Sequence, residues 1–154
     1  MRAFTFCLLL LLHLQVGATE LLFPSQVNQL FTGAPRLVVL WSVDCPPCYK
    51  ELSMLEKLLK DHPQLPLTLV ATDDDTARYP EVESMHQRLT GQELQKWVFA
   101  DLKASEIRFS IDKSWSGVLP RSYFINSEGS RIGHSGVLQA QQVLDWYNIE
   151  KLRP

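Results

Sequence analysis

The sequence predicts an α/β fold with a mixed central sheet flanked by helices on both faces. Strand and helix patterns alternate along the chain, and an antiparallel hairpin and a final helix follow them. This order is typical of a sheet layered between helices. With 154 residues, of which 45% are hydrophobic and 21% charged, the chain has the length and composition of one compact domain.

The first predicted strand, Arg36–Ser42, is a continuous apolar run, which is typical of a strand buried on both faces. The segment before it, Glu20–Phe31, is weakly patterned and supplies only candidate core contacts, which are Leu21, Leu22, Phe23, Val27, Leu30 and Phe31. After the strand, leucines three or four residues apart predict an amphipathic helix that runs to about Lys60. Leu65–Thr72 reads as a second buried strand, and Asp73–Asp75 as a solvated loop.

The rest of the chain predicts shorter elements. Arg121–Ile125 and Arg131–Ser135 flank the turn "NSEG", in which Gly129 can adopt positive φ, and together they predict a β-hairpin. The other expected elements are a helix at Glu81–Leu89, a strand at Trp97–Ala100, a helix at Ala104–Ile111 and a closing helix at Gln139–Ile149.

Residues 1–18 have the pattern of a secretory signal peptide. Arg2 precedes the apolar run Ala3–Leu12, and Val16–Ala18 ends in small residues. The run has roughly ten residues, whereas a bilayer span needs roughly 20. We therefore expect residues 19–154 to form the domain and to be exported, in the bacterial periplasm. The alternative is a protein that an uncleaved N-terminal segment anchors to the membrane.

The charge and the cysteine content reduce the number of functions that the sequence supports. The net charge is −2 and there is no basic block, so nucleic-acid binding has no electrostatic support. Cleavage would remove Cys7 and leave only Cys45 and Cys48. An exported protein meets oxidising conditions, but a disulfide framework normally uses several spaced pairs. One tight pair is instead expected of a redox site.

Three other uses of a cysteine pair have less support than redox chemistry in the segment "WSVDCPPC". A c-type haem needs histidine after the second cysteine, and Tyr49 stands there. Structural zinc usually needs four ligands, whereas the three histidines His62, His86 and His134 are scattered, so we predict no metal. A crosslink over so short a loop restricts the unfolded chain little.

The position of the pair also favours redox chemistry. Cys45 lies where a buried strand gives way to a helix, and the N–H groups and dipole of a helix N-terminus stabilise a thiolate. The thiolate is the species that attacks a disulfide. Cys48, within the first helical turn, is near enough to resolve the mixed disulfide.

The motif "VVLWSVDCPPCYKEL" resembles the active-site segment of thioredoxin-fold proteins, most of all the TlpA-like exported thiol–disulfide oxidoreductases. The stretch "GVLPRSYFINSEGSRIGHSG" resembles that branch's proline loop with its strand, turn and strand. The resemblance implies a thioredoxin-like fold, no cofactor, protein disulfide substrates and re-reduction by a membrane thiol-electron donor. It also implies a redox-active Cys45–Cys48 disulfide and a substrate site at Trp41, Leu119 and Pro120, where Pro120 matches the family's cis-proline.

Glu51 matches an acidic position of the TlpA-like branch. In thioredoxin a buried aspartate lies six residues before the first cysteine, and here Val39 stands at that position. Glu51, one turn beyond Cys48, is the candidate to accept the proton from Cys48. The alternative is an exposed helical residue that pairs with Lys50 or Lys57.

The neighbours of Cys45 indicate the direction of electron flow. Pro46 and Pro47 carry no N–H, and Asp44 adds a negative charge, so we expect a raised Cys45 pKa. We expect the positive charge of Arg121 to offset the negative charge of Asp44 in part. Destabilising the thiolate makes the pair a better reductant, which predicts a reductase of exported protein disulfides. The alternatives are a disulfide oxidase or isomerase, a thiol peroxidase, and a non-catalytic binding module with the same fold.

Overall fold

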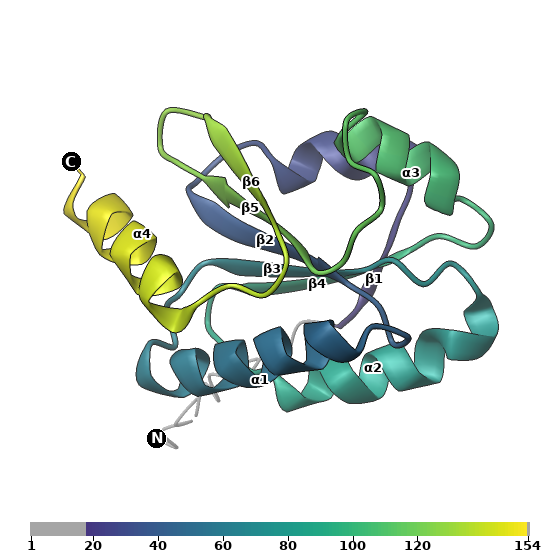
Figure 1. Cartoon of the computed structure of the whole chain (residues 1–154), viewed down its shortest axis with the longest axis horizontal. Coiled ribbons are helices and arrows are strands. Elements are labelled where there is room, and N and C mark those ends of the chain that lie inside the picture. Colours follow the sequence, from purple (N-terminus) through teal and green to yellow (C-terminus); the bar gives the residue numbers. More distant parts are fainter. Residues whose placement is uncertain (1–17, 154) are drawn as a thin grey trace, which may run out of the picture.

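The computed structural model describes residues 18–153, so Cys7 and nearly all of the predicted signal peptide lie outside the described residues. Its centre is a six-stranded sheet in the order β1-β4-β3-β2-β5-β6 (Figure 1). The strands are β1 (Glu20–Leu22), β2 (Arg36–Trp41), β3 (Leu67–Ala71), β4 (Leu94–Phe99), β5 (Arg121–Ile125) and β6 (Arg131–Ser135).

The sheet is mixed, as the sequence predicts. The pairs β1–β4, β4–β3 and β3–β2 are parallel. The pairs β2–β5 and β5–β6 are antiparallel, and β5 and β6 have the bounds expected of the hairpin strands. Gly129 in the connecting turn has φ 77°, a conformation that favours glycine.

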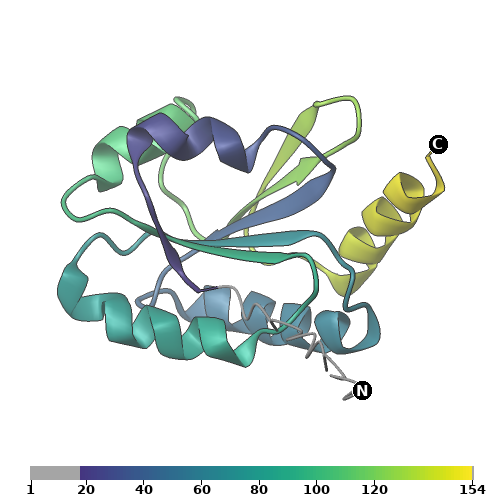
Figure 2. The same ribbon diagram turned by 180° about the vertical axis from the view of Figure 1, so that it is seen from behind.

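Helices cover both faces of the sheet (Figures 1 and 2). Helices α1 (Pro46–Asp61) and α2 (Tyr79–Arg88) lie on one face, and α3 (Ala104–Ile111) lies on the other with the 3-10 helix η1 (Pro24–Leu30). A second 3-10 helix, η2 (Thr76–Arg78), leads directly into α2, and α4 (Ala140–Leu152) closes the chain. Among residues 18–153, we find no helix long and apolar enough to cross a membrane.

Strand β2 contributes to two hydrophobic cores. Leu37, Val39 and Trp41 join the cluster beneath α1, whereas Val38 and Leu40 join the cluster beneath η1 and α3. All five side chains have no exposed surface. Because successive side chains of a strand point to opposite faces, a strand covered on both sides needs the unbroken apolar run that the sequence shows.

The N-terminal segment departs from the sequence prediction. Residues Glu20–Leu22 form an edge strand, and η1 follows it, although neither element was predicted. Leu22, Val27 and Leu30 enter the core as expected. Leu21 and Phe23 do not, because they are 43% and 45% exposed, so their assignment as core residues was wrong.

Candidate redox site

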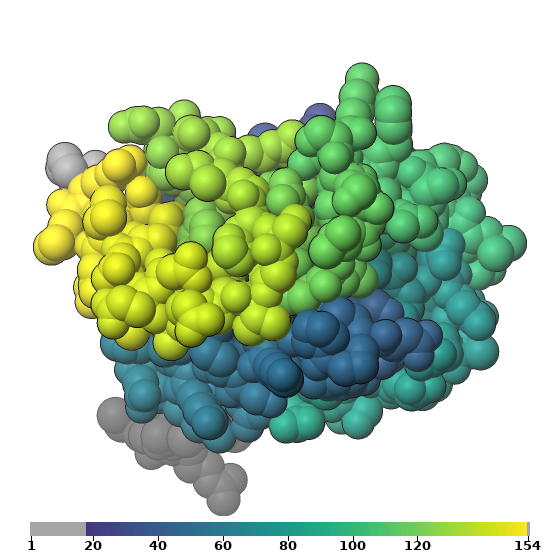
Figure 3. Space-filling view, in the orientation of Figure 1, coloured from purple at the N-terminus to yellow at the C-terminus, as the bar shows by residue number. Residues whose placement is uncertain are grey.

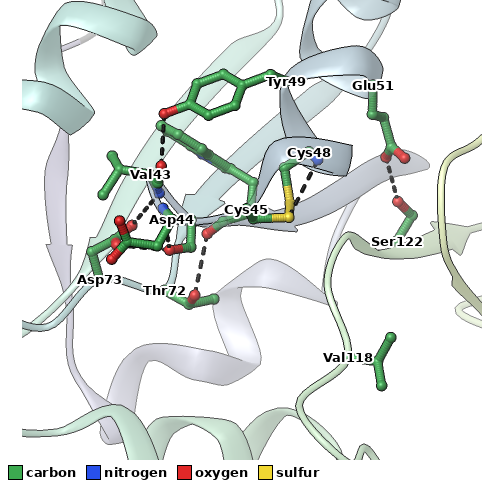
Figure 4. Close-up of a disulfide and its surroundings, with 12 residues drawn as sticks. Val43, Asp44, Cys45, Cys48, Tyr49, Glu51, Thr72, Asp73, Val118 and Ser122 are labelled. Atoms are coloured by element: carbon green, nitrogen blue, oxygen red, sulfur yellow. Dashed lines mark hydrogen bonds between the residues drawn. A yellow bond between two sulfur atoms is a disulfide. The ribbon is translucent and has the colours of Figure 1, made fainter.

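The two cysteines form a disulfide at the junction of β2 and α1 (Figure 4). Cys45 is the N-cap residue of α1, and Cys48 lies in its first turn. Their Cα atoms are 5.3 Å apart. The Pro residues between them occupy the first helical positions, where a missing N–H costs no intrahelical hydrogen bond. The local sequence therefore starts the helix and brings the two sulfurs together.

The Cys45 sulfur accepts one backbone N–H within the described part of the chain. The Cys48 N–H donates to Cys45 Sγ over 3.2 Å and also contacts the Cys45 carbonyl oxygen at 2.9 Å. Pro46 and Pro47 are exposed and contribute no donor. Cys45 is 8% exposed and Cys48 is 1% exposed. Cys45 is therefore the more accessible of the two cysteines.

The loop before Cys45 is held by side chains that the sequence reading did not assign to the site. Asp73 accepts hydrogen bonds from Ser42 Oγ and from the Val43 N–H. The hydroxyl of Tyr49 donates to the Val43 carbonyl oxygen over 2.8 Å. Burial raises the pKa of Asp73 above its ordinary value, and the two donors and Arg78 oppose that rise. In the sequence, only the position of Asp73 directly after a predicted buried strand could have indicated this role.

The "DDD" stretch is therefore not the solvated loop that was expected. Asp73 binds the Ser42–Asp44 loop, Asp74 Oδ2 accepts the N–H of Ala104 at the start of α3, and Asp75 caps η2 through the N–H of Ala77. Only Asp75 of the three is exposed. Each carboxylate satisfies a backbone donor that the end of an element or a loop would otherwise leave open.

Asp44 is paired with Arg78, and not with Arg121 as expected. Both guanidinium nitrogens of the Arg78 fork reach the Asp44 carboxylate, at 2.9 and 3.0 Å. Arg121 instead bonds Asp112 at 3.1 Å and donates to Ser135 Oγ at 2.9 Å. Alternation along β5 turns Arg121 to the face opposite Ser122, so the expectation that it offsets Asp44 was wrong.

Glu51 is fully buried, with 0% of its surface exposed, so its alternative as an exposed partner of Lys50 or Lys57 is wrong. One carboxylate oxygen accepts a hydrogen bond from Ser122 Oγ at 2.8 Å (Figure 4). The other accepts the Leu138 N–H at 2.9 Å. Burial raises the pKa of Glu51, and these two donors oppose the rise. A carboxyl with a raised pKa is suited to accept a proton, although its hydrogen bonds here join α1 to β5 and to the segment before α4.

The proline loop lies beside the disulfide. The peptide bond between Leu119 and Pro120 is cis. In the space-filling view, the blue segment at the start of α1 lies against the green segment that carries this loop (Figure 3). Val118 is 53% exposed, whereas Leu119 is partly buried and packs against both core clusters. The loop therefore offers apolar surface next to the cysteine pair.

Trp41 does not contribute to that surface. The side chain is fully buried and belongs to the core beneath α1, so it presents no exposed surface to a substrate. Its indole N–H donates to His86 Nε2 at 3.2 Å, and His86 Nδ1 lies 2.9 Å from Thr19 Oγ1. Because Nε2 accepts, Nδ1 is the protonated nitrogen and donates to Thr19. Burial lowers the pKa of His86 to about 4, and Lys96 adds to that lowering.

Metal ligation finds no support in the described residues. Between residues 18 and 153, no three His, Cys, Asp or Glu side chains converge in a way that could hold a metal ion.

Comparison with known proteins places the fold. No model of a known protein family matches the chain, and no curated protein matches it. Solved structures do match. StoA from Bacillus subtilis is 22% identical with a TM-score of 0.53, and the match covers 75% of this chain and 83% of StoA. A secreted disulfide oxidoreductase from Mycobacterium tuberculosis, homologous to E. coli DsbE, is 14% identical with a TM-score of 0.57 over 88% and 96%.

A thio-disulfide isomerase from Thermus thermophilus matches over 90% of this chain and 99% of its own, with a TM-score of 0.57 and 13% identity. These proteins are thioredoxin-like thiol–disulfide oxidoreductases, and this chain likewise carries a CxxC pair. At such low identity the likeness establishes the thioredoxin-like fold, which the sequence predicted.

Proposed function

We propose that the chain is an exported thiol–disulfide oxidoreductase that reduces the disulfides of exported proteins through Cys45 and Cys48. The observation that carries this proposal is the Cys45–Cys48 disulfide at the N-terminus of α1, beside the proline loop, in which Val118 is exposed and Pro120 is buried. The likeness to solved thiol–disulfide oxidoreductases supports the same reading. A binding module that merely retained the fold would have no need to place a paired cysteine next to an open apolar surface.

Cys45 is the attacking residue and Cys48 the resolving one in the proposed cycle. Cys45 is the more exposed and is the N-cap residue of α1. Its thiolate attacks a substrate disulfide, forms a mixed disulfide and releases one substrate thiolate. Cys48 then attacks Cys45 Sγ, which re-forms the Cys45–Cys48 disulfide and releases the second substrate thiolate. Two electrons pass to the substrate, and the released thiolates take up protons.

Glu51 is the proposed proton acceptor for Cys48. It lies one helical turn beyond Cys48, and burial raises its pKa toward the range in which a carboxylate can exchange protons with a thiol. Its hydrogen bonds to Ser122 and Leu138 fix the orientation of the carboxyl group.

The hydrogen-bond donors around Cys45 support the proposed direction of electron flow. Among residues 18–153, a single N–H reaches its sulfur, because Pro46 and Pro47 supply none. Fewer donors disfavour the thiolate, and a less stable reduced form makes a stronger reductant. Asp44 contributes less than the sequence implied, because Arg78 compensates its charge. The two prolines therefore carry most of the argument for reduction.

Export and re-reduction complete the proposal. The signal-like residues 1–18 support export. An exported reductase needs a source of electrons, for which a membrane thiol-electron donor is proposed. N-terminal sequencing of the protein recovered from outside the cytoplasm should begin at Thr19, whereas a start at Met1 in the membrane fraction would favour the anchored alternative.

The central experiment is trapping with Cys48→Ala. Without its resolving thiol, Cys45 should stay covalently attached to its substrate, and a reductant should release the adduct. Cys45→Ala is the matched control and should trap nothing. Failure of the Cys48→Ala variant to trap any protein, together with no insulin reduction by the wild-type protein, would contradict the catalytic proposal.

Redox potential separates the reductase from an oxidase or isomerase. Equilibration with glutathione buffers measures the reduction potential of the Cys45–Cys48 pair. In a reductase, this potential should lie nearer to that of thioredoxin, about −270 mV, than to that of a strong exported oxidant, about −120 mV. A value at the oxidising end would leave the exchange chemistry in place but reverse the proposed direction.

A further inference from the structure

Asp73 lies beside the redox loop because of the register of two parallel strands. Trp41 of β2 and Ala71 of β3 are partners in the ladder, and both strands end at these residues. The residues that follow each strand therefore leave the sheet at the same edge. Asp73, two residues after β3, meets Val43, two residues after β2 (Figure 4).

Both oxygens of the Asp73 carboxylate are used on this loop. Oδ1 accepts the Ser42 hydroxyl at 2.8 Å, and Oδ2 accepts the Val43 N–H at 3.2 Å. Ser42 Oγ in turn accepts the Asp44 N–H at 3.1 Å, and the Ser42 carbonyl oxygen accepts the Cys45 N–H at 3.2 Å. One carboxylate thus anchors, directly or through Ser42, the loop that carries Cys45.

We propose that Asp73 is a positioning residue of the redox site. Its carboxylate holds the Ser42–Cys45 loop in the conformation in which the Cys48 N–H donates to the Cys45 sulfur. Its negative charge also disfavours the thiolate of Cys45. This inference rests on the proposed thiol–disulfide exchange and extends it. Asp73 does not touch the reacting sulfurs, and it acts through the loop and through its charge.

The backbone N–H groups of the loop before Cys45 are already bound to other groups. The N–H groups of Val43 and Asp44 are bound to Asp73 and to Ser42 Oγ, so neither is free to turn toward the Cys45 sulfur. With Pro46 and Pro47 lacking N–H groups, a thiolate on Cys45 has one local backbone donor. A nearby like charge further disfavours ionisation of the thiol.

Two charged residues act on Asp73 itself. Arg78 and Asp44 act on the Asp73 carboxylate in opposite directions, and burial is the largest influence on its pKa. Arg78 is also committed to Asp44 and Glu81 through its own ion pairs. The Tyr49 hydroxyl, which bonds Val43, has its pKa raised by burial first and by Asp73 among other neighbours.

The test compares Asp73→Asn with Asp75→Asn. Asparagine keeps the size of the side chain but removes the charge and one acceptor, so it loosens the loop. Asp75→Asn makes the same charge change two residues away, where the side chain caps η2 and has no bond to the Ser42–Cys45 loop. The pH dependence of Cys45 alkylation is measured in the reduced proteins.

The midpoint of Cys45 alkylation should fall by about one pH unit in Asp73→Asn and stay unchanged in Asp75→Asn. Ser42→Ala, which removes the hydroxyl link but keeps the charge, should lower it by less. Asp73→Glu, which restores the charge, should return the midpoint toward the wild-type value. If Asp73→Asn fails to fold, the Ser42→Ala and Asp73→Glu values decide.

Equal midpoints in the wild-type protein, Asp73→Asn and Ser42→Ala would overturn the assignment of Asp73. That result would leave the proposed function untouched, because insulin reduction and trapping test it separately. Conversely, alkylation requires no substrate protein, so a wild-type chain that reduces no disulfide would still report the effect of Asp73 on Cys45.

Discussion

Glu51 and His86 are titratable side chains with no exposed surface, and burial shifts their pKa values in opposite directions. Burial disfavours whichever form is charged, so the pKa of Glu51 rises and that of His86 falls to about 4. Both residues keep hydrogen-bond partners, Glu51 with Ser122 and Leu138 and His86 with Trp41. The free energy of unfolding should therefore depend on pH through each residue, in opposite directions.

Glu51 should make the folded protein lose stability as the pH rises. Between 4.5 and its raised folded pKa, the folded state holds a proton that the unfolded state has released. The free energy of unfolding of the wild type should therefore fall, relative to that of Glu51→Gln, as the pH rises above 4.5. Urea denaturation of the oxidised proteins at pH 4.5 and 7 measures this difference. A difference that does not change with pH would contradict the assignment.

His86 should have the opposite effect. Its folded pKa of about 4 lies below the ordinary 6.5, so the folded state binds fewer protons between these values. Stability should be intact above pH 6.5 and should fall as the pH drops toward 4. At about 1.4 kcal/mol per unit, the wild type should lose about 3 kcal/mol relative to His86→Gln. Denaturation of both proteins at pH 7 and 4 tests this, and parallel losses would count against it.

At the scale of elements, prediction succeeded where a local pattern determines the element. Helix α3 and the strands β5 and β6 have the predicted bounds, because apolar periodicity and a turn signal define them. Strand β1 was missed because it has three residues and only one buried side chain. Its existence depends on parallel pairing with β4, far along the chain, which no local pattern records.

In the β5–β6 hairpin, the side chain of Arg121 on β5 packs over Gly133 on β6, and this contact can be tested. Gly133 lies opposite Tyr123 in the ladder, and a Cβ added to it would collide with the Arg121 guanidinium group. The guanidinium group is the far end of a flexible side chain and can shift, but a shift disturbs its ion pair with Asp112 at 3.1 Å. Gly133→Ala should therefore lower the free energy of unfolding by about 1–3 kcal/mol.

A double-mutant cycle provides the control for Gly133→Ala. In an Arg121→Ala background the collision is removed, so adding the alanine at position 133 should cost much less. Chemical denaturation of the four proteins gives the coupling energy. Additive effects would show that Arg121 does not mediate the cost.

At the scale of the whole molecule, the site combines parts that the sequence located with parts that only the fold brings together. The cysteine pair, its place before a helix and the proline loop could be located because each has a local motif. Asp73 and Arg78 could not be assigned, because they reach the Ser42–Asp44 loop through the β2–β3 register and through η2. Trp41, at the end of β2, lies in the core beneath α1, as its place in a continuous apolar run predicts.

The redox state of the pair should control the stability of the whole domain. If the folded pair is a reductant, its disulfide is harder to reduce in the folded chain than in the unfolded chain. By the thermodynamic cycle, the oxidised protein must then be the more stable form, by about 1.4 kcal/mol for every 30 mV between the two potentials. Guanidinium denaturation with and without a reductant should show the higher midpoint for the oxidised protein. A variant with both Cys45→Ser and Cys48→Ser should be indifferent to the reductant. A more stable dithiol form would instead identify an oxidant, because a stabilised reduced form is what makes an exported oxidant strong.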